Sequence, residues 1–270
     1  SWVNLAYQPK NVAPVIDDIA IQDPGIRVVG FPMQQSGPGT AVPVQLRYPR
    51  IAGSTSFAPM NTEGANQGSQ IEVPPQGFRD KSYQSVLWSA HDDNDDDLVF
   101  SMYYRGEGEQ NWRLLKDKLK QRYYSWDTTT MPDGAYYLKI VASDSLSNPV
   151  DQALSTERES DRFQVANTPP QIVNLRAGSG LLNTKASWEA TSSSSAIARA
   201  EYSVDSGDWK ILFPTDLLSD SPKESYFVQL PGLPPGEHTL AVQVTDQFDN
   251  TAAAQVTFTV EPHGMPQHAP

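Results

Sequence analysis

The sequence of 270 residues contains no cysteine. That absence excludes a disulfide framework, a thiol nucleophile and metal sites built on cysteine. No apolar run is long enough for a membrane-spanning helix, so membrane insertion is not expected. Basic residues are outnumbered, with 20 Lys and Arg against 32 Asp and Glu, for a formal net charge of −12. Because nucleic acids and anionic membrane surfaces are also negative, no nucleic-acid partner is expected.

The signatures of common catalytic sites are missing as well. There is no Gly-x-Ser-x-Gly elbow, no His-Glu-x-x-His pair and no phosphate-binding loop. The four histidines, His91, His238, His263 and His268, stand in no recognisable partner pattern. We therefore expect a protein that is not an enzyme and has no catalytic or cofactor-binding residue. Hydrophobic residues at 38% nevertheless suffice for a core and are too frequent for a disordered chain.

A long-period repeat organises the chain. The segment Val86-Leu-Trp88-Ser-Ala90 is repeated about 100 residues later as Ala186-Ser-Trp188-Glu-Ala190. Further along, Asp144 and Asn148 have counterparts in Asp246 and Asn250. The first copy carries an insertion at about residues 26–80, whose apolar stretches 26–31 and 41–48 could form extra strands. Two matched units with one insertion are the simplest account.

Both copies follow the period of β-strands. Side chains in 136–142 alternate in polarity, and those in 238–244 keep the same phase. Turn pairs such as Asp133-Gly134 and Pro235-Gly236 separate the alternating runs. The sequence thus predicts an all-β chain of two tandem seven-stranded antiparallel immunoglobulin- or fibronectin III-like sandwiches. The strands expected are 14–20, 84–90, 98–105, 112–115, 123–128, 135–144 and 162–165, then 170–176, 184–190, 198–204, 209–213, 226–230, 237–245 and 254–260.

Four regions follow from this pattern. Residues 1–10 are expected to be an upstream linker or the remnant of a preceding domain. The first sandwich is expected at 11–166 and the second at 167–260, joined by a Pro-stiffened link that makes a semi-rigid rod. Residues 261–270 are expected to form a flexible tail.

Four aromatic residues and a turn carry a family resemblance. Trp88 and Trp188 on the second strand, Tyr104 and Tyr202 on the third, and the Pro-x-Gly turns resemble fibronectin type III or bacterial immunoglobulin-like domains. These four residues are expected in the cores. The block 88–134 is similar to domains in the C-terminal part of large exported bacterial proteins, often behind a β-propeller.

This resemblance implies a non-catalytic structural or interaction module of an exported protein, serving as a spacer, an orienting element or an adhesion module. It implies an extracellular, periplasmic or cell-surface location, with an upstream domain of the same polypeptide, or an extracellular protein or glycan, as partner. The alternative is a carbohydrate-binding accessory module of a polysaccharide-degrading enzyme. Solvent exposure of Trp112 or Trp209 would favour that alternative.

An acidic run between the second and third strands is the sharpest local feature, and it comprises Asp92, Asp93, Asp95, Asp96 and Asp97. Five carboxylates this close repel one another unless they are solvated or bound to a cation, and oxygen ligands suit Ca²⁺. The spacing does not fit an EF-hand, and a solvated turn is the competing interpretation. No cofactor is expected other than weakly bound Ca²⁺ at this loop, which should lie at the same end of the sandwich as a long loop at 145–160.

Overall fold

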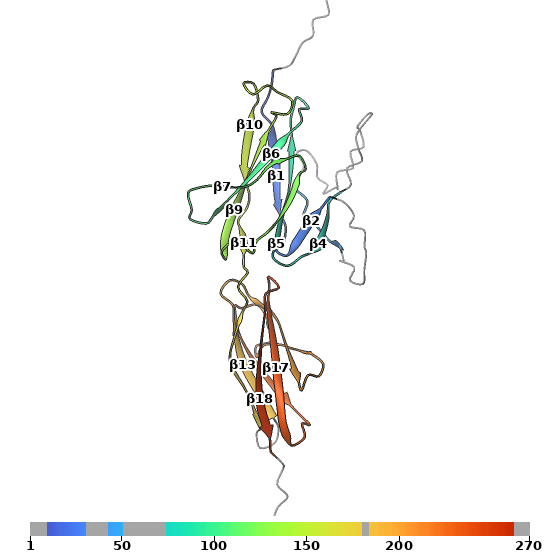
Figure 1. Cartoon of the computed structure of the whole chain (residues 1–270), viewed down its shortest axis with the longest axis vertical. Coiled ribbons are helices and arrows are strands. Elements are labelled where there is room, and N and C mark those ends of the chain that lie inside the picture. Colours follow the sequence, from blue (N-terminus) through green and yellow to red (C-terminus); the bar gives the residue numbers. More distant parts are fainter. Residues whose placement is uncertain (1–9, 31–42, 51–73, 180–183, 262–270) are drawn as a thin grey trace, which may run out of the picture. The chain divides into compact units, whose positions relative to one another are not determined.

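The structure is a computed structural model that describes residues 10–30, 43–50, 74–179 and 184–261. It divides into two compact units, which we call unit one (Ser1–Val165) and unit two (Ala166–Pro270). The described segments form antiparallel sheets (Figure 1), which confirms the predicted all-β fold. Within those segments no helix is long and apolar enough to cross a membrane. Residues 1–9 and 262–270, and with them most of the predicted linker and tail, lie outside the described part.

Unit one is a sandwich of two sheets. One sheet has the order β1-β5-β8, and the other has the order β10-β9-β6-β7, with β11 pairing with β9 as well. These strands are β1 (Val15–Ile21), β5 (Tyr83–His91), β6 (Val99–Gly106), β7 (Arg113–Leu119), β8 (Tyr123–Asp127), β9 (Gly134–Ser143), β10 (Ser155–Glu159) and β11 (Phe163–Val165). In the lettering of immunoglobulin-type sandwiches, β1 is strand A, β5 is B, β6 is C, β7 is C′, β8 is E and β9 is F. Strand G is divided into β10 and β11.

The core of unit one lies between these sheets because alternate side chains of each strand point inward. Trp88 on β5 is 1% exposed, and its ring meets Phe100 of β6 edge-on with the centroids 5.4 Å apart. Leu138 and Ile140 of β9 are fully buried beside them. Tyr104 is only partly buried and packs against the edge of the same core.

One predicted loop was partly wrong. We expected a loop across 145–160, but residues 155–159 form β10, which pairs with β9 from Ser155 opposite Ser143 to Glu159 opposite Lys139. This strand is an edge strand with charged, exposed side chains, and Lys139 forms an ion pair with Glu157 at 3.0 Å. Charged edge strands discourage unwanted pairing, and they lack the apolar alternation by which strands are recognised.

The insertion between β1 and β5 forms a small third sheet. Its order is β2-β4-β3, with β2 at Ile26–Val29, β3 at Pro43–Val44 and β4 at Gln76–Arg79. Two of these strands fall in the predicted apolar stretches, β4 was not predicted, and residues 31–42 lie outside the described part. Ile26 and Val28 pack with Leu87 of β5, so the inserted sheet covers the outer face of the sandwich.

Unit two repeats the arrangement. Its sheets have the orders β12-β13-β16 and β15-β14-β17-β18. The strands are β12 (Gln171–Ser179), β13 (Thr184–Thr191), β14 (Ile197–Val204), β15 (Lys210–Leu212), β16 (Lys223–Leu230), β17 (Gly236–Asp246) and β18 (Thr251–Val260). Trp188 is buried and stacks on Tyr226 with ring centroids 5.3 Å apart, while Tyr202 is partly buried against this core.

A buried histidine on β17 is held between two acceptors. His238 Nδ1 lies 2.6 Å from Asp205 Oδ2, and its Nε2 lies 2.9 Å from the Pro234 carbonyl oxygen. Both ring nitrogens can donate only when the imidazole is protonated. The hydrogen bond to Asp205 is the main cause that raises the pKa of His238, and the same bond lowers the pKa of the Asp205 carboxyl.

We expect this pair to make the stability of unit two depend on pH. Because the pKa of His238 is raised in the folded state, its contribution is complete below the unfolded value of about 6.5 and is lost as pH rises through the folded value. The wild type should therefore lose stability relative to His238→Gln as pH rises above about 6.5. Paired thermal melts at each pH measure the difference, since glutamine donates a hydrogen bond but does not titrate. A difference that stays constant across this range would show that the pair contributes no pH-dependent stability.

Candidate functional site

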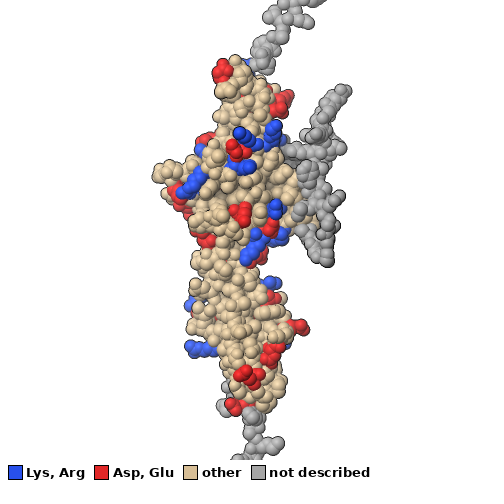
Figure 2. All heavy atoms as spheres, viewed as in Figure 1, with Lys and Arg blue, Asp and Glu red and all other residues tan. Residues whose placement is uncertain are grey.

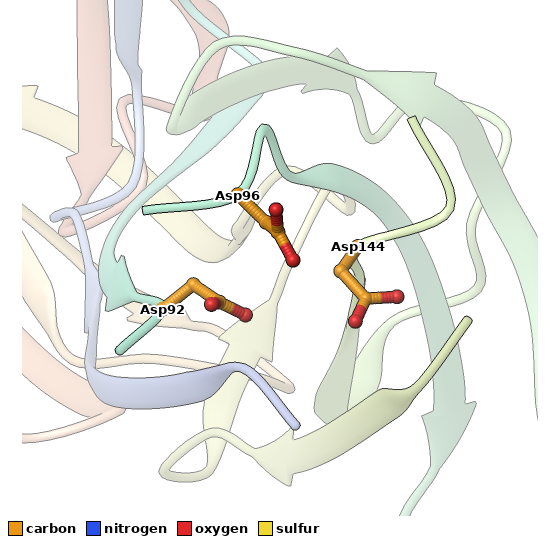
Figure 3. Close-up of side chains that lie close together, drawn as sticks. All are labelled: Asp92, Asp96 and Asp144. Atoms are coloured by element: carbon orange, nitrogen blue, oxygen red, sulfur yellow. The ribbon is translucent and has the colours of Figure 1, made fainter. Parts of the chain in front are cut away.

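Three carboxylates converge at one end of unit one (Figure 3). Asp92 directly follows β5, Asp96 lies in the loop between β5 and β6, and Asp144 directly follows β9. One carboxylate oxygen from each lies within 4.8 Å of the others. The strands explain the meeting, because β5, β6 and β9 deliver the B–C and F–G loops to the same end of the sandwich. We call Asp92, Asp96 and Asp144 the inner acids.

The structure separates the predicted acidic run into two sets. Asp92 and Asp96 join the cluster, whereas Asp93, Asp95 and Asp97 are exposed and lie outside it. Asp95 has a positive φ of 60°, so the chain turns sharply within the loop. We call Asp93, Asp95 and Asp97 the outer acids. The third inner acid, Asp144, was not among the predicted ligands.

Hydrogen bonds from the loops orient two of the inner acids. The Asn94 backbone N–H donates to Asp92 Oδ1 at 2.8 Å, and Asn148 Nδ2 donates to Asp96 Oδ2 at 2.7 Å. The second oxygen of Asp92, Oδ2, is buried and has no hydrogen-bond partner. Because a carboxylate oxygen carries two lone pairs, the bonded oxygens also keep capacity for a cation.

Asp144 ties the cluster to the segment that precedes β1. The Leu154 backbone N–H donates to Asp144 Oδ1 at 2.7 Å, and Asn11 Nδ2 donates to Asp144 Oδ2 at 2.7 Å. The same Asn11 amide donates to the Gln152 carbonyl oxygen at 2.9 Å. Asp144 is 0% exposed, so its charge lies fully inside the protein.

In the described part of the chain, no Lys, Arg or His forms an ion pair with an inner acid. The nearby His91 is bonded to Asp17 at 2.9 Å, which raises the pKa of this histidine, and it faces the outer acid Asp93 at 3.9 Å. Two like charges about 5 Å apart repel by roughly 3 kcal/mol at an effective dielectric constant near 20. The inner acids can therefore attract a cation.

In unit two, the aspartate equivalent to Asp144 accepts its hydrogen bonds from its own loop and, among the described residues, has no cluster of acids around it. Asp246 corresponds to Asp144 and accepts the backbone N–H groups of Phe248 and Asn250 at 2.9 Å each. Asn250 Nδ2 adds a third hydrogen bond at 3.2 Å. Serines 192–195 occupy the loop that is acidic in unit one. The repeat of Asp144 and Asn148 as Asp246 and Asn250 was therefore the signal that could have identified Asp144.

The two tryptophans that directly precede the C′ strands, β7 and β15, have different surroundings. Trp112 is half-buried, and Arg105 and Lys139 lie over its ring at 4.7 Å and 5.1 Å from the centroid. Trp209 in unit two is 47% exposed. Trp209 therefore has the solvent exposure that would favour a carbohydrate-binding module, whereas Trp112 is partly covered.

No known family model matches the chain, and no curated protein matches its sequence. Solved structures do match. The fibronectin(III)-like modules of Clostridium thermocellum CbhA are 17% identical over 70% of this chain and 92% of theirs, with a TM-score of 0.32. Dimeric latent PorU from Porphyromonas gingivalis is 14% identical over 68% of this chain and 22% of PorU, with a TM-score of 0.31. The FN1–FN3 domains of chicken CNTN1 are 13% identical over 66% of this chain and 63% of theirs, also at 0.31.

The class of the protein follows from its own strand order. Each unit has a three-stranded A-B-E sheet, faced by a second sheet that contains C′, C, F and G. Each also has a buried tryptophan on strand B. The chain is a tandem of fibronectin type III-like β-sandwiches, and the first sandwich carries an inserted sheet.

Proposed function

We propose that the chain is a non-catalytic structural and interaction module of an exported bacterial protein, where it spaces, orients or attaches a neighbouring domain. The space between the sheets of each unit is filled by side chains around Trp88 and Trp188. Five residues, 166–170, separate the last strand of unit one from the first strand of unit two, and two of them are prolines. The export and the upstream partner domain rest on the resemblance of residues 88–134 to modules of exported bacterial proteins.

The observation that carries the interaction role is an apolar strip on the edge of unit two. Among the described strands β15 pairs with β14 alone, and Trp209, Ile211 and Phe213 are 47%, 61% and 64% exposed. Ile211 lies in β15, and Trp209 and Phe213 flank the strand at the alternate positions of an extended chain. Contiguous exposed apolar side chains on a soluble domain mark binding surfaces. We call these three residues the β15 strip.

The surroundings of the strip indicate the chemistry of its partner. The following loop adds exposed Leu217 and Leu218. Exposed Asp208, Asp216 and Asp220 lie close by in sequence, with Lys210 as the basic residue among them. Elsewhere on the chain, Lys and Arg lie among Asp and Glu on the visible face of both units (Figure 2). The partner that fits is a protein surface with an apolar centre and basic residues around it.

Site-specific photocrosslinking in the producing cell tests this role. A photoreactive phenylalanine analogue replaces Phe213 in the strip, and the matched control carries it at Phe227, which is also exposed but lies on β16 of the other sheet. We expect one protein or neighbouring domain to crosslink at 213 and not at 227, with contact residues rich in Lys and Arg. The crosslink should disappear in Ile211→Asp. Equal crosslinking at both positions would contradict the proposal.

A carbohydrate-binding role is the second candidate, and two exposed aromatic rings that flank β15 favour it. Trp209 and Phe213 lie four residues apart, a spacing of about 13 Å in a fully extended chain. Affinity electrophoresis in soluble cellulose, xylan and chitin derivatives distinguishes the candidates. If retardation occurs and is lost in Trp209→Ala, the strip binds glycan. A protein-binding module should migrate equally with and without polysaccharide.

A further inference from the structure

We infer that the inner acids Asp92, Asp96 and Asp144 bind one Ca²⁺, and that the bound ion clasps the segment Asn11–Val12 onto the end of unit one. The site lies in unit one and does not depend on the β15 strip. The three carboxylates come from two loops and converge within 4.8 Å, with Asp92 and Asp144 buried. Ca²⁺ takes six to eight oxygen ligands from carboxylates, carbonyls and water, which suits a partly built acidic site of this kind.

A buried oxygen without a partner gives the second and independent reason. Asp92 is 9% exposed, and its Oδ2 accepts no hydrogen bond from the protein. Figure 3 shows the Asp92 carboxylate directed into the space that it shares with Asp96 and Asp144. Burying a charged oxygen without a partner is unfavourable, and coordination to a cation removes that penalty. Hydrogen bonds within the protein therefore leave one buried oxygen of the cluster, Asp92 Oδ2, without a partner.

Comparison with unit two shows that the fold does not require this arrangement. Asp246 occupies the position of Asp144 and is satisfied by three hydrogen bonds from its own loop. In unit one, Asp144 accepts two hydrogen bonds and also faces two further carboxylates that have no counterpart in unit two. Like charges this close repel one another, and a bound cation would relieve that repulsion.

The ligand type favours Ca²⁺ over other divalent ions. All three donors are carboxylate oxygens, and the chain has no cysteine. His91 is engaged with Asp17 and is not part of the cluster, so the nitrogen ligand that zinc prefers is missing from it. Mg²⁺ requires near-ideal octahedral geometry and retains its water, whereas Ca²⁺ accepts irregular loop geometry.

The same loops hold the chain just before β1. The Val12 backbone N–H donates to Asn94 Oδ1 at 2.7 Å, and Asn11 Nδ2 donates to Asp144 Oδ2. Asn94 stands between Asp92 and Asp96, and its own N–H is bonded to Asp92 Oδ1. A bound ion would hold the three inner acids together. It would thereby fix Asn94 and Asp144, the side chains that accept hydrogen bonds from residues 12 and 11.

Calorimetric titration of the full 270-residue chain with Ca²⁺, after removal of metals by a chelator, tests the site. We expect one site with a Kd of about 10⁻⁴–10⁻³ M, the range of extracellular Ca²⁺ modules. At about ten times this concentration, the melting temperature of unit one should rise by about 3–6 °C. The same concentration of Mg²⁺ should have a much smaller effect.

Two variants of equal charge separate coordination from general screening. The inner variant Asp92→Asn with Asp96→Asn should melt at or above the wild type without Ca²⁺, because repulsion is relieved, and it should lose the response to Ca²⁺. The outer variant Asp95→Asn with Asp97→Asn should keep the full response. No heat and no shift in the wild type, an equal response to Mg²⁺, or equal losses in both variants would overturn the inference.

Amide hydrogen exchange in the wild type gives a readout that needs no variant. Ca²⁺ should slow exchange of the Val12 amide at least several-fold, because opening at this position requires release of Asn94. Should the inner variant fail to fold, an unchanged rate at Val12 would itself overturn the inference.

Discussion

Replacing Trp88 by alanine should lower the free energy of unfolding of unit one by about 3–5 kcal/mol. The indole is 1% exposed, and it contacts Phe100 of the facing sheet edge-on at 5.4 Å. Alanine would leave a cavity between two sheets that cannot close without moving β5, which also carries the inserted sheet through Leu87. The effect is large because the lost burial and the cavity add together.

Native-state hydrogen exchange is the right measurement, because two units of one chain need not unfold in a single step. Amides of β9 should lose several kcal/mol of protection in Trp88→Ala, while those of β17 in unit two should not change. The matched control is Trp209→Ala, where the exposed ring should contribute within about 0.5 kcal/mol to stability. A loss of protection below 1 kcal/mol in β9 would show that Trp88 is not a central core residue.

Strands with one buried face were predictable from sequence for a simple reason. In β9 and β17 buried side chains alternate with partly exposed ones over most of the strand, and the same phase in both repeats reinforced the interpretation. The tryptophans of β5 and β13 lie among apolar or small neighbours, which favoured the core over an exposed sugar-stacking role. Periodicity therefore predicted the architecture where one face is buried.

The same reasoning misses strands whose pairing is stabilised by polar contacts. β10 has the sequence Ser-Thr-Glu-Arg-Glu, and its side chains are mostly exposed, so nothing in its pattern resembles a half-buried strand. β4 is short, and it contributes to an inserted sheet whose core is completed by Leu87 of the main sandwich. Such strands depend on neighbours that are distant in sequence, which a local pattern cannot reveal.

The candidate site was only half predictable. A run of acids in sequence suggested a cation site, yet Asp93, Asp95 and Asp97 are exposed and lie outside the cluster. The missing member, Asp144, lies about 50 residues away and is brought near by the F strand. A sequence motif indicated which loop carries charge, and only the fold shows which carboxylates meet.

Replacing Asp246, the aspartate of unit two that corresponds to Asp144, should lower stability, whereas the inner variant of unit one should not lose stability without Ca²⁺. Asp246 is 1% exposed and accepts three hydrogen bonds, from the N–H groups of Phe248 and Asn250 and from the Asn250 amide. Asp246→Ala removes the acceptor of the backbone N–H groups of Phe248 and Asn250, and it leaves the Asn250 amide with the Ala166 carbonyl oxygen at 2.9 Å as its remaining acceptor. We expect a loss of about 2–4 kcal/mol in the stability of unit two.

The paired variant in unit one is Asp144→Ala, measured without Ca²⁺ by exchange of β9 amides. It removes two hydrogen bonds but also relieves repulsion with Asp92 and Asp96, so its loss should be at least 1 kcal/mol smaller than that of Asp246→Ala. Adding Ca²⁺ should increase the difference in stability between the wild type and Asp144→Ala. It should leave the loss caused by Asp246→Ala unchanged. Equal losses of stability at the two positions, with and without Ca²⁺, would mean that both aspartates only accept hydrogen bonds that order their loops.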